Sequence, residues 1–247
     1  MHERDSRIVF EEEGHRYTVD GCSDQWVSVT TLVHSLFQPF DADVVAAKII
    51  DSRAYANGTS KYCGMTAEEI KHGWEESASV ARNRGTHMHQ QIDMYYTPDQ
   101  PRGVHYPEYP QFQSFVRDHP HYEPFRVEWR IFDEDVRVCG SVDMVYRDTT
   151  SDGYVIVDWK RSKMIRTHNP YARGIHACSS ALDDCNFIHY SLQLGIYRYI
   201  LTKKYSLPVT KCLIVVLHPR QETYHKIPIA DVAKNVDQLM CSRLLLS

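Results

Sequence analysis

The chain has 247 residues, of which 43% are hydrophobic and 24% are charged, and its formal net charge is −4. This length fits one large domain, and the acidic balance excludes a protein that binds nucleic acid through a globally basic surface, although a local basic region can still hold phosphates. The sequence has no run of roughly 18 apolar residues, as a membrane span requires, and no apolar segment of a secretory signal near its start.

The first 65 residues predict a hairpin followed by short helices. Residues 7–21 read as two short strands around Glu13 and Gly14. Residues 28–40 have apolar side chains at helical spacing, with Ser28 or Thr30 as the N-cap. Residues 41–50 predict a second helix, capped by Asp41. Residues 51–66 are polar and glycine-containing, so we expect them to be mostly loop.

A helical region is predicted from Thr66 to Tyr96, because Thr66 and Glu69 have the form of a capping box. Gly73 and Gly85 are expected to break this region or to allow a close backbone approach. Residues 97–110 hold four prolines and predict a loop. A further helix is expected over residues 111–119.

The second half of the chain predicts a mixed sheet flanked by helices. The expected strands cover residues 125–132, 136–147, 154–160, 211–218 and 222–229, and the expected helices cover residues 188–205 and 231–246. This order predicts an α/β or α+β layered fold. We expect a single domain over residues 1–247, with an N-terminal addition (1–65), a core (66–230) and a C-terminal helix (231–247).

Two carboxylates and an ammonium group stand on the inner side of one predicted hairpin. Asp158 and Lys160 share one face of their strand. A short turn joins this strand to the strand of Asp143, so the two strands are neighbours about 4.8 Å apart. Two buried carboxylates repel each other, and a divalent cation such as Mg²⁺ or Mn²⁺ removes that cost. Lys160 can stabilise charge on a phosphate or position water. The alternative is an exposed salt bridge on a solvated face of the sheet.

These residues resemble the catalytic core of PD-(D/E)XK nucleases, in the variant whose second acid is Asp. The run Gly140 to Asp143 resembles the G-[ST]-[IV]-D form of RecB-like and lambda-exonuclease-like members, and Val157 to Lys160 resembles the second half of the core motif. Residues 84–89 resemble the RGT-x-x-H helix, Glu128 resembles an acid on the preceding strand, and residues 193–197 resemble the Q-x-x-x-Y motif. The resemblance spans residues 84–197 and implies a restriction-endonuclease-like core.

The resemblance also implies a role for each matching residue. Asp143, Asp158, Lys160 and Glu128 are the expected catalytic residues, and His89, Asp143, Asp158 and the carbonyl of Trp159 are the expected metal ligands. Glu128 fits a second ligand of the metal or of water and an ordinary sheet carboxylate equally well, and His89 can instead be a hydrogen-bonded structural histidine. The rival His87 is expected to point to another side of the helix.

The residues expected to contact DNA lie on both sides of the catalytic motif. No Asp or Glu occurs from Trp159 to Leu182, which favours phosphate binding there. Gln193 and Tyr197 line one helix face, although Tyr197 can also be a core residue. The full set of expected DNA contacts is Arg84, Thr86, Arg161, Lys163, Arg166, Gln193 and Tyr197.

The resemblance implies a metal-dependent deoxyribonuclease, and its branch implies an exonuclease that digests DNA from its ends, in the 5′→3′ direction, in recombination, repair or genome processing, as in phages and viruses. The alternatives are an endonuclease on the same core, a non-catalytic nucleic-acid-binding module and an unrelated metalloprotein. One branch of the superfamily carries an iron–sulfur cluster, but the seven cysteines lack its clustered spacing, so we expect none. Reduced thiols favour the cytoplasm or nucleus. Strand preference and oligomeric state stay open.

Overall fold

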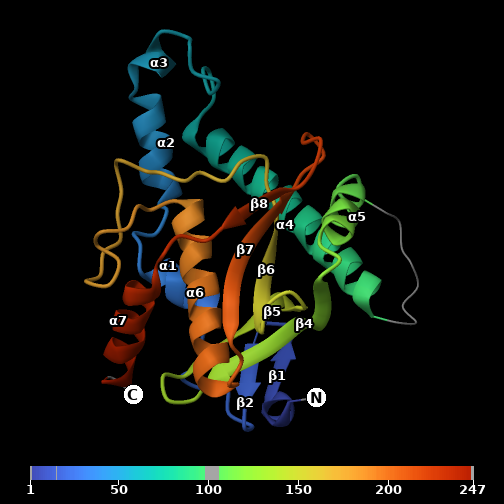
Figure 1. Cartoon of the computed structure of the whole chain (residues 1–247). Helices are drawn as coiled ribbons and strands as arrows, with labels where there is room; N and C mark the ends of the chain where they lie inside the picture. The colour runs from blue at the N-terminus through green and yellow to red at the C-terminus, as the bar shows by residue number, and fades with distance from the viewer. Residues whose placement is uncertain (1, 15, 98–105, 246–247) are drawn as a thin grey trace. The chain divides into compact units, whose positions relative to one another are not determined.

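A computed structural model of the chain describes residues 2–14, 16–97 and 106–245, and Figure 1 shows its elements. The chain divides into two compact units. The first unit contains residues 1–38 and 88–247, and the second contains residues 39–87. No helix in the described part of the chain is long and apolar enough to cross a membrane.

The first unit begins with the predicted hairpin. A short 3₁₀ helix, η1 (Glu3–Arg7), leads into β1 (Ile8–Glu11), which pairs antiparallel with β2 (Arg16–Val19). A two-residue strand that the sequence did not reveal, β3 (Val27–Ser28), precedes α1 (Val29–Ser35). The Ser28 hydroxyl accepts a hydrogen bond from the backbone N–H of Thr31 at 3.1 Å, so Ser28 is the N-cap of α1.

A six-stranded mixed sheet forms the centre of the first unit, which confirms the predicted α/β class. Its strand order is β3-β5-β6-β7-β8, and β4 pairs with β5. The long strands are β4 (Tyr122–Asp133), β5 (Val138–Asp148), β6 (Gly153–Arg161), β7 (Val209–Leu217) and β8 (His225–Pro228). The β5–β6 pair is antiparallel, whereas β6 and β7 are parallel and are connected through α6 (Asn186–Lys204).

Helices cover both faces of this sheet. On one face, α1, α6 and α7 (Ala233–Leu244) pack against Val142, Val145, Ile156 and Ile214. On the other face, the last turns of α4 (Ala67–Tyr96) and α5 (Tyr109–Asp118) pack against Val155, Val157, Trp159 and Val215. Figure 1 shows α6 lying along β7 on the first face. The alternation along β6 places Asp158 and Lys160 on one face, as the sequence predicted, and this is the face that α6 covers.

The second unit contains α2 (Ala42–Ile50), α3 (Arg53–Ala56) and the first part of α4. Asp41 caps α2 as predicted, since its Oδ1 accepts hydrogen bonds from the N–H groups of Asp43 and Val44 at 3.0 Å. The predicted capping box is also present: Thr66 N–H donates to Glu69 Oε2 at 2.7 Å, and Glu69 N–H donates to Thr66 Oγ1 at 3.2 Å.

Of the sequence expectations about local structure, one holds apart from a short helix and one is wrong. Residues 51–66, expected to be mostly loop, contain the four-residue helix α3. The expected break at Gly73 or Gly85 is wrong, because α4 runs without interruption from Ala67 to Tyr96. A helical glycine costs only about 1 kcal/mol relative to alanine, which thirty residues of continuous helix outweigh. The proline-rich stretch is described only at Thr97 and from Tyr106 onward, and its residues 98–105 lie outside the described part.

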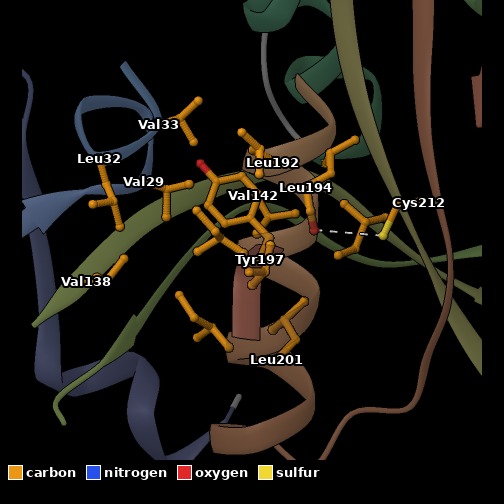
Figure 2. Close-up of a cluster of buried hydrophobic side chains, with 14 of the residues drawn as sticks. Val29, Leu32, Val33, Val138, Val142, Leu192, Leu194, Tyr197, Leu201 and Cys212 are labelled. Carbon is orange, nitrogen blue, oxygen red and sulfur yellow. Dashed lines mark hydrogen bonds between the residues drawn. The ribbon is translucent and has the colours of Figure 1, made fainter. Parts of the chain in front are cut away.

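Gly140 on β5 allows the sheet and α6 to approach closely. A Cβ atom at this position would lie 2.9 Å from Cε1 and 3.0 Å from the hydroxyl oxygen of Tyr197, which is itself buried in the core. Figure 2 shows the Tyr197 ring among Val142, Leu194 and other side chains of that core. Any residue larger than glycine must therefore displace Tyr197.

We expect Gly140→Ala to lower the free energy of unfolding by about 1–3 kcal/mol, the usual cost of overpacking a closed core. Gly73→Ala serves as the control, because a Cβ at Gly73 meets no described atom within 4 Å and alanine favours the helix by about 1 kcal/mol. Urea unfolding of the three proteins measures both effects. A Gly140→Ala variant as stable as the parent would contradict this packing.

Candidate active site

The candidate site lies at a fork in the sheet, where β6 separates from β5. The β5–β6 ladder extends from Asp148 only as far as the pair Met144 and Val157. Continuing the same register places Asp143 opposite Asp158. Instead of pairing with backbone, the N–H of Trp159 donates to Oδ2 of Asp143 at 2.9 Å. The two predicted carboxylates therefore stand on neighbouring strands, and one of them replaces a ladder partner.

Three potential metal ligands converge at this fork. His89 on α4, Glu128 on β4 and Asp143 on β5 offer ligand atoms that all lie within 4.8 Å of one another. Nδ1 of His89 lies 3.6 Å from Oε1 of Glu128 and 3.6 Å from Oδ2 of Asp143. Nε2 of His89 lies 2.9 Å from the carbonyl oxygen of Trp159. The structure thus brings together His89, Asp143 and the Trp159 carbonyl, which were expected as metal ligands, and Glu128, which was expected as a catalytic residue.

Glu128 owes its position to an unusual backbone conformation. Its φ angle is 44°, in the left-handed region that residues other than glycine rarely adopt. Val127 and Trp129 on either side keep regular pairing with Met144 and Val142, so Glu128 lies across from Asp143. The hydroxyl of Ser141 donates to Oε2 of Glu128 at 3.1 Å. Such a conformation costs of order 1–3 kcal/mol and is concentrated at functional sites, which favours a role of Glu128 in the site.

Asp158 and Lys160 form a close ion pair beside this cluster. Asp158 is 1% exposed, and Nζ of Lys160 lies 2.8 Å from its Oδ1 and 2.7 Å from its Oδ2. Burial raises the pKa of Asp158, and the charge of Asp143 adds to this effect while Lys160 opposes it. Burial would lower the pKa of Lys160, but the Asp158 and Asp143 carboxylates outweigh it and raise that pKa. Lys160 therefore stays protonated and carries the charge that neutralises Asp158.

The charge of His89 depends on the same carboxylates. Burial lowers the pKa of the imidazole, but Asp143 and Glu128 outweigh it and raise that pKa to about 9. In the absence of a cation, the protonated imidazole thus balances two acids. A metal ion that binds here must displace this proton, so metal binding and proton release are coupled.

The donor chemistry fits a divalent cation. Carboxylate and carbonyl oxygens suit Mg²⁺ and Mn²⁺, and an imidazole suits Mn²⁺ in particular. Oδ2 of Asp158 is buried and lies 2.7 Å from the Lys160 ammonium, which neutralises it. His89, Glu128 and Asp143 would hold the cation. Asp158 and the Trp159 carbonyl, which were also expected as ligands, are neighbours of this group of three residues.

The residues expected to contact DNA have different surroundings. Lys163 and Arg166 are exposed on the segment that follows β6. Arg161 is largely buried, and its Nε is paired with the buried carboxylate of Glu108. Glu108 precedes Arg161 by 53 residues in the sequence, and its buried carboxylate explains why Arg161 is not at the surface. Arg84 and Thr86 are exposed on the part of α4 that belongs to the second unit.

The Q-x-x-x-Y pair is also more buried than its expected role in binding DNA requires. Tyr197 lies in the core, as the alternative interpretation had it, and burial raises its pKa well above the usual value. Nε2 of Gln193 lies 3.5 Å from the Tyr197 hydroxyl. Gln193 is only partly buried. Of the two residues, only Gln193 thus has a side chain that is partly accessible to a substrate.

The structure adds Tyr190, which sequence reasoning missed. Nζ of Lys160 lies 4.9 Å from the centroid of the Tyr190 ring. Tyr190 precedes Gln193 by three residues and Tyr197 by seven, so the three side chains share one face of α6. That spacing is the signal in the sequence that extends the Q-x-x-x-Y pattern by one turn toward the catalytic lysine.

Comparisons with known proteins identify the family. A model of the PD-(D/E)XK nuclease superfamily matches residues 31–242, which is most of the chain. The protein therefore belongs to the PD-(D/E)XK nuclease superfamily, which implies a nucleic-acid substrate and chemistry that uses divalent metal ions. The predicted superfamily and its fold are thereby confirmed.

Two further comparisons add little detail. No curated protein matches the chain significantly. A solved structure titled "Crystal structure of SSO0001" shares 13% sequence identity over 92% of this chain and 78% of its own, with a TM-score of 0.35. At that TM-score we draw nothing further from the likeness.

Proposed function

We propose that the protein is a Mg²⁺- or Mn²⁺-dependent deoxyribonuclease of the RecB-like or lambda-exonuclease-like branch, which digests DNA from its ends in the 5′→3′ direction. The observation that carries this proposal is the convergence of His89, Glu128 and Asp143 next to the buried pair of Asp158 and Lys160. This activity fits a role in DNA recombination, repair or genome processing. The corresponding location is the cytoplasm or nucleus, or a host cell if the protein is viral.

Each residue of the site has a distinct part in the proposed reaction. A bound divalent cation supplies Lewis-acid stabilisation of charge on the scissile phosphate and on the attacking water. The N–H of Trp159 donates a hydrogen bond that fixes the carboxylate of Asp143, and the hydroxyl of Ser141 donates one that fixes the carboxylate of Glu128. Lys160 carries a fixed positive charge in a largely buried site, where it stabilises the additional negative charge of the transition state.

A cavity lined by residues of β2, β3, α1 and β5 supports end recognition. It has a volume of about 230 Å³, and its lining includes Arg16, Ser28, Thr31 and Cys139. Cys139 precedes Ser141 on β5 by two residues, and the Ser141 hydroxyl in turn donates to Glu128. A pocket with an arginine and two hydroxyl groups suits a phosphate at a chain end.

The test compares linear and covalently closed circular DNA of the same sequence, each with Mg²⁺, Mn²⁺ or EDTA. Stepwise shortening of the linear DNA alone, abolished by EDTA, is the expected result, and 5′-phosphorylated ends should be digested faster than 5′-hydroxyl ends. Cleavage of the circle would replace the exonuclease by an endonuclease on the same site. Binding without cleavage under any metal would leave a non-catalytic nucleic-acid-binding module and overturn the proposal.

Tyr190 is expected to affect the rate of cleavage through Lys160. Tyr190→Leu removes the aromatic face below the ammonium group, and we expect kcat to fall about 2- to 30-fold, which corresponds to a cation–π contact of about 0.5–2 kcal/mol. KM should stay within about 2-fold of the parent. Tyr190→Phe keeps the ring and should retain the parent kcat. Equal loss in both variants would show that the hydroxyl, rather than the ring, is what the site uses.

A further inference from the structure

The segment from Ser162 to Cys185, which joins β6 to α6, displays large apolar side chains to solvent. Tyr171 is 95% exposed, Met164 is 75% exposed and Ile175 is 53% exposed. Along the sequence these side chains alternate with the cations Lys163, Arg166 and Arg173. A contiguous patch would suggest a protein partner, whereas isolated apolar and aromatic side chains between cations suit unpaired bases.

Cations without acidic partners accompany these side chains. Lys163 and Arg166 are exposed, and neither makes an ion pair within the described residues. The acids of the segment lie at its far end, where Asp183 pairs with His168 and Arg173. In the half of the segment that carries Met164 and Tyr171, Lys163 and Arg166 thus have no acidic partner among the described residues, whereas His168 is paired with Asp183.

Hydrogen bonds hold the exposed tyrosine on an ordered turn. Oδ1 of Asn169 accepts from the N–H of Tyr171 at 3.1 Å, and Nδ2 of Asn169 donates to the carbonyl of Asp184 at 2.7 Å. Farther along, the N–H of Ile175 donates to the carbonyl of Leu36 on the α1 side at 2.9 Å. The backbone around Tyr171 is thus fixed in advance, which lowers the entropic cost of stacking on its ring.

The segment connects the strand that carries Lys160 to the helix that carries Tyr190. The segment starts two residues after Lys160, and it ends at the helix whose Tyr190 ring lies next to the Lys160 ammonium. The carbonyl of Arg166 accepts a hydrogen bond from Phe187 N–H at 3.1 Å, which ties the basic half of the segment to the start of α6. A strand bound along the segment would therefore lead toward the fork.

We infer that the Ser162–Cys185 segment binds single-stranded DNA, with a base stacked on Tyr171 and phosphates held by Lys163 and Arg166. The inference rests on the proposed nuclease function, since it assigns to the same site a substrate with unpaired bases. It predicts a preference for ends that carry a single-stranded overhang over blunt duplex ends.

The test measures the affinity of a fluorescent oligothymidylate of about 16 nucleotides by anisotropy, with EDTA and separately with Ca²⁺. Tyr171→Ala and Tyr171→Leu should weaken binding about 5- to 150-fold, as expected for one lost base–aromatic stack. Tyr171→Phe is the matched control and should bind as the parent does. Lys163→Ala and Arg166→Ala should each reduce the slope of log K against log salt by about 0.7.

The outcomes separate this inference from the nuclease function. Unchanged affinity in Tyr171→Ala, or no binding of the oligonucleotide by the parent protein, overturns the inference while metal-dependent cleavage of duplex DNA still stands. Equal affinity of Tyr171→Leu and the parent also overturns it, because an apolar contact without stacking is then sufficient. Weakened binding in Tyr171→Ala and Tyr171→Leu, without any cleavage by the parent, supports the surface and rejects the nuclease.

Discussion

Asp158→Asn is expected to reduce DNA cleavage by about 10²- to 10³-fold or more, the range seen when one preorganised electrostatic group is removed from an active site. Asp158 is buried, faces Asp143 on the next strand and holds both of its oxygens toward Lys160. Asparagine keeps the shape of the side chain but removes its charge. The charge available to a cation therefore falls, and the Lys160 ammonium loses its counter-charge.

Cleavage rates at saturating Mg²⁺ or Mn²⁺ measure this prediction, and circular dichroism confirms that the variant is folded. Asp152→Asn is the control, because Asp152 is an exposed acid in the turn between β5 and β6. This variant should cleave DNA at the rate of the parent protein. Calorimetric titration with Mn²⁺ should show weaker binding in Asp158→Asn only. Full activity in that variant would exclude Asp158 from the catalytic machinery.

The longer strands, and the position of Asp143 opposite Asp158, could be predicted because they depend on short-range patterns. The turn at residues 149–153 sets the register of two strands with clear alternation, and that register aligns the two acids. His89 was found through its Arg84–Thr86 context, since spacing along a helix is a local property. Metal binding by these residues remains a prediction that the titration above will decide.

The remaining features depend on contacts between distant segments, which a local pattern does not contain. Arg161 reads as a DNA contact until Glu108, 53 residues earlier, is found buried beside it. Tyr190 gains its role only when α6 packs over the end of β6. The left-handed backbone of Glu128 has no signature in its side-chain sequence, because any residue there reads as ordinary strand. These features are specified by tertiary packing and not by propensity.

Lys160→Met is expected to lower the free energy of unfolding in EDTA by about 3–5 kcal/mol, because it leaves the buried carboxylate of Asp158 without a counter-charge. The double variant Asp158→Leu with Lys160→Met should recover most of that loss, since replacing both partners of a buried pair by apolar groups is often neutral. Divalent cations should stabilise Lys160→Met more than the parent, because a cation then supplies the missing positive charge.

Lys211→Met provides the matched comparison for this second prediction. Lys211 pairs with Asp148 at 2.8 Å, and the Asp148 side chain is inaccessible to solvent like that of Asp158, but Lys211 itself is half-exposed whereas Lys160 is largely buried. Asp148 also accepts hydrogen bonds from the N–H and Oγ1 of Thr150 at 3.0 and 2.6 Å, so it keeps partners when Lys211 is removed. We therefore expect a smaller loss and no added response to Mg²⁺. Equal losses in both variants, equally insensitive to Mg²⁺, would mean that the Asp158–Lys160 pair is structural and that the cation binds elsewhere.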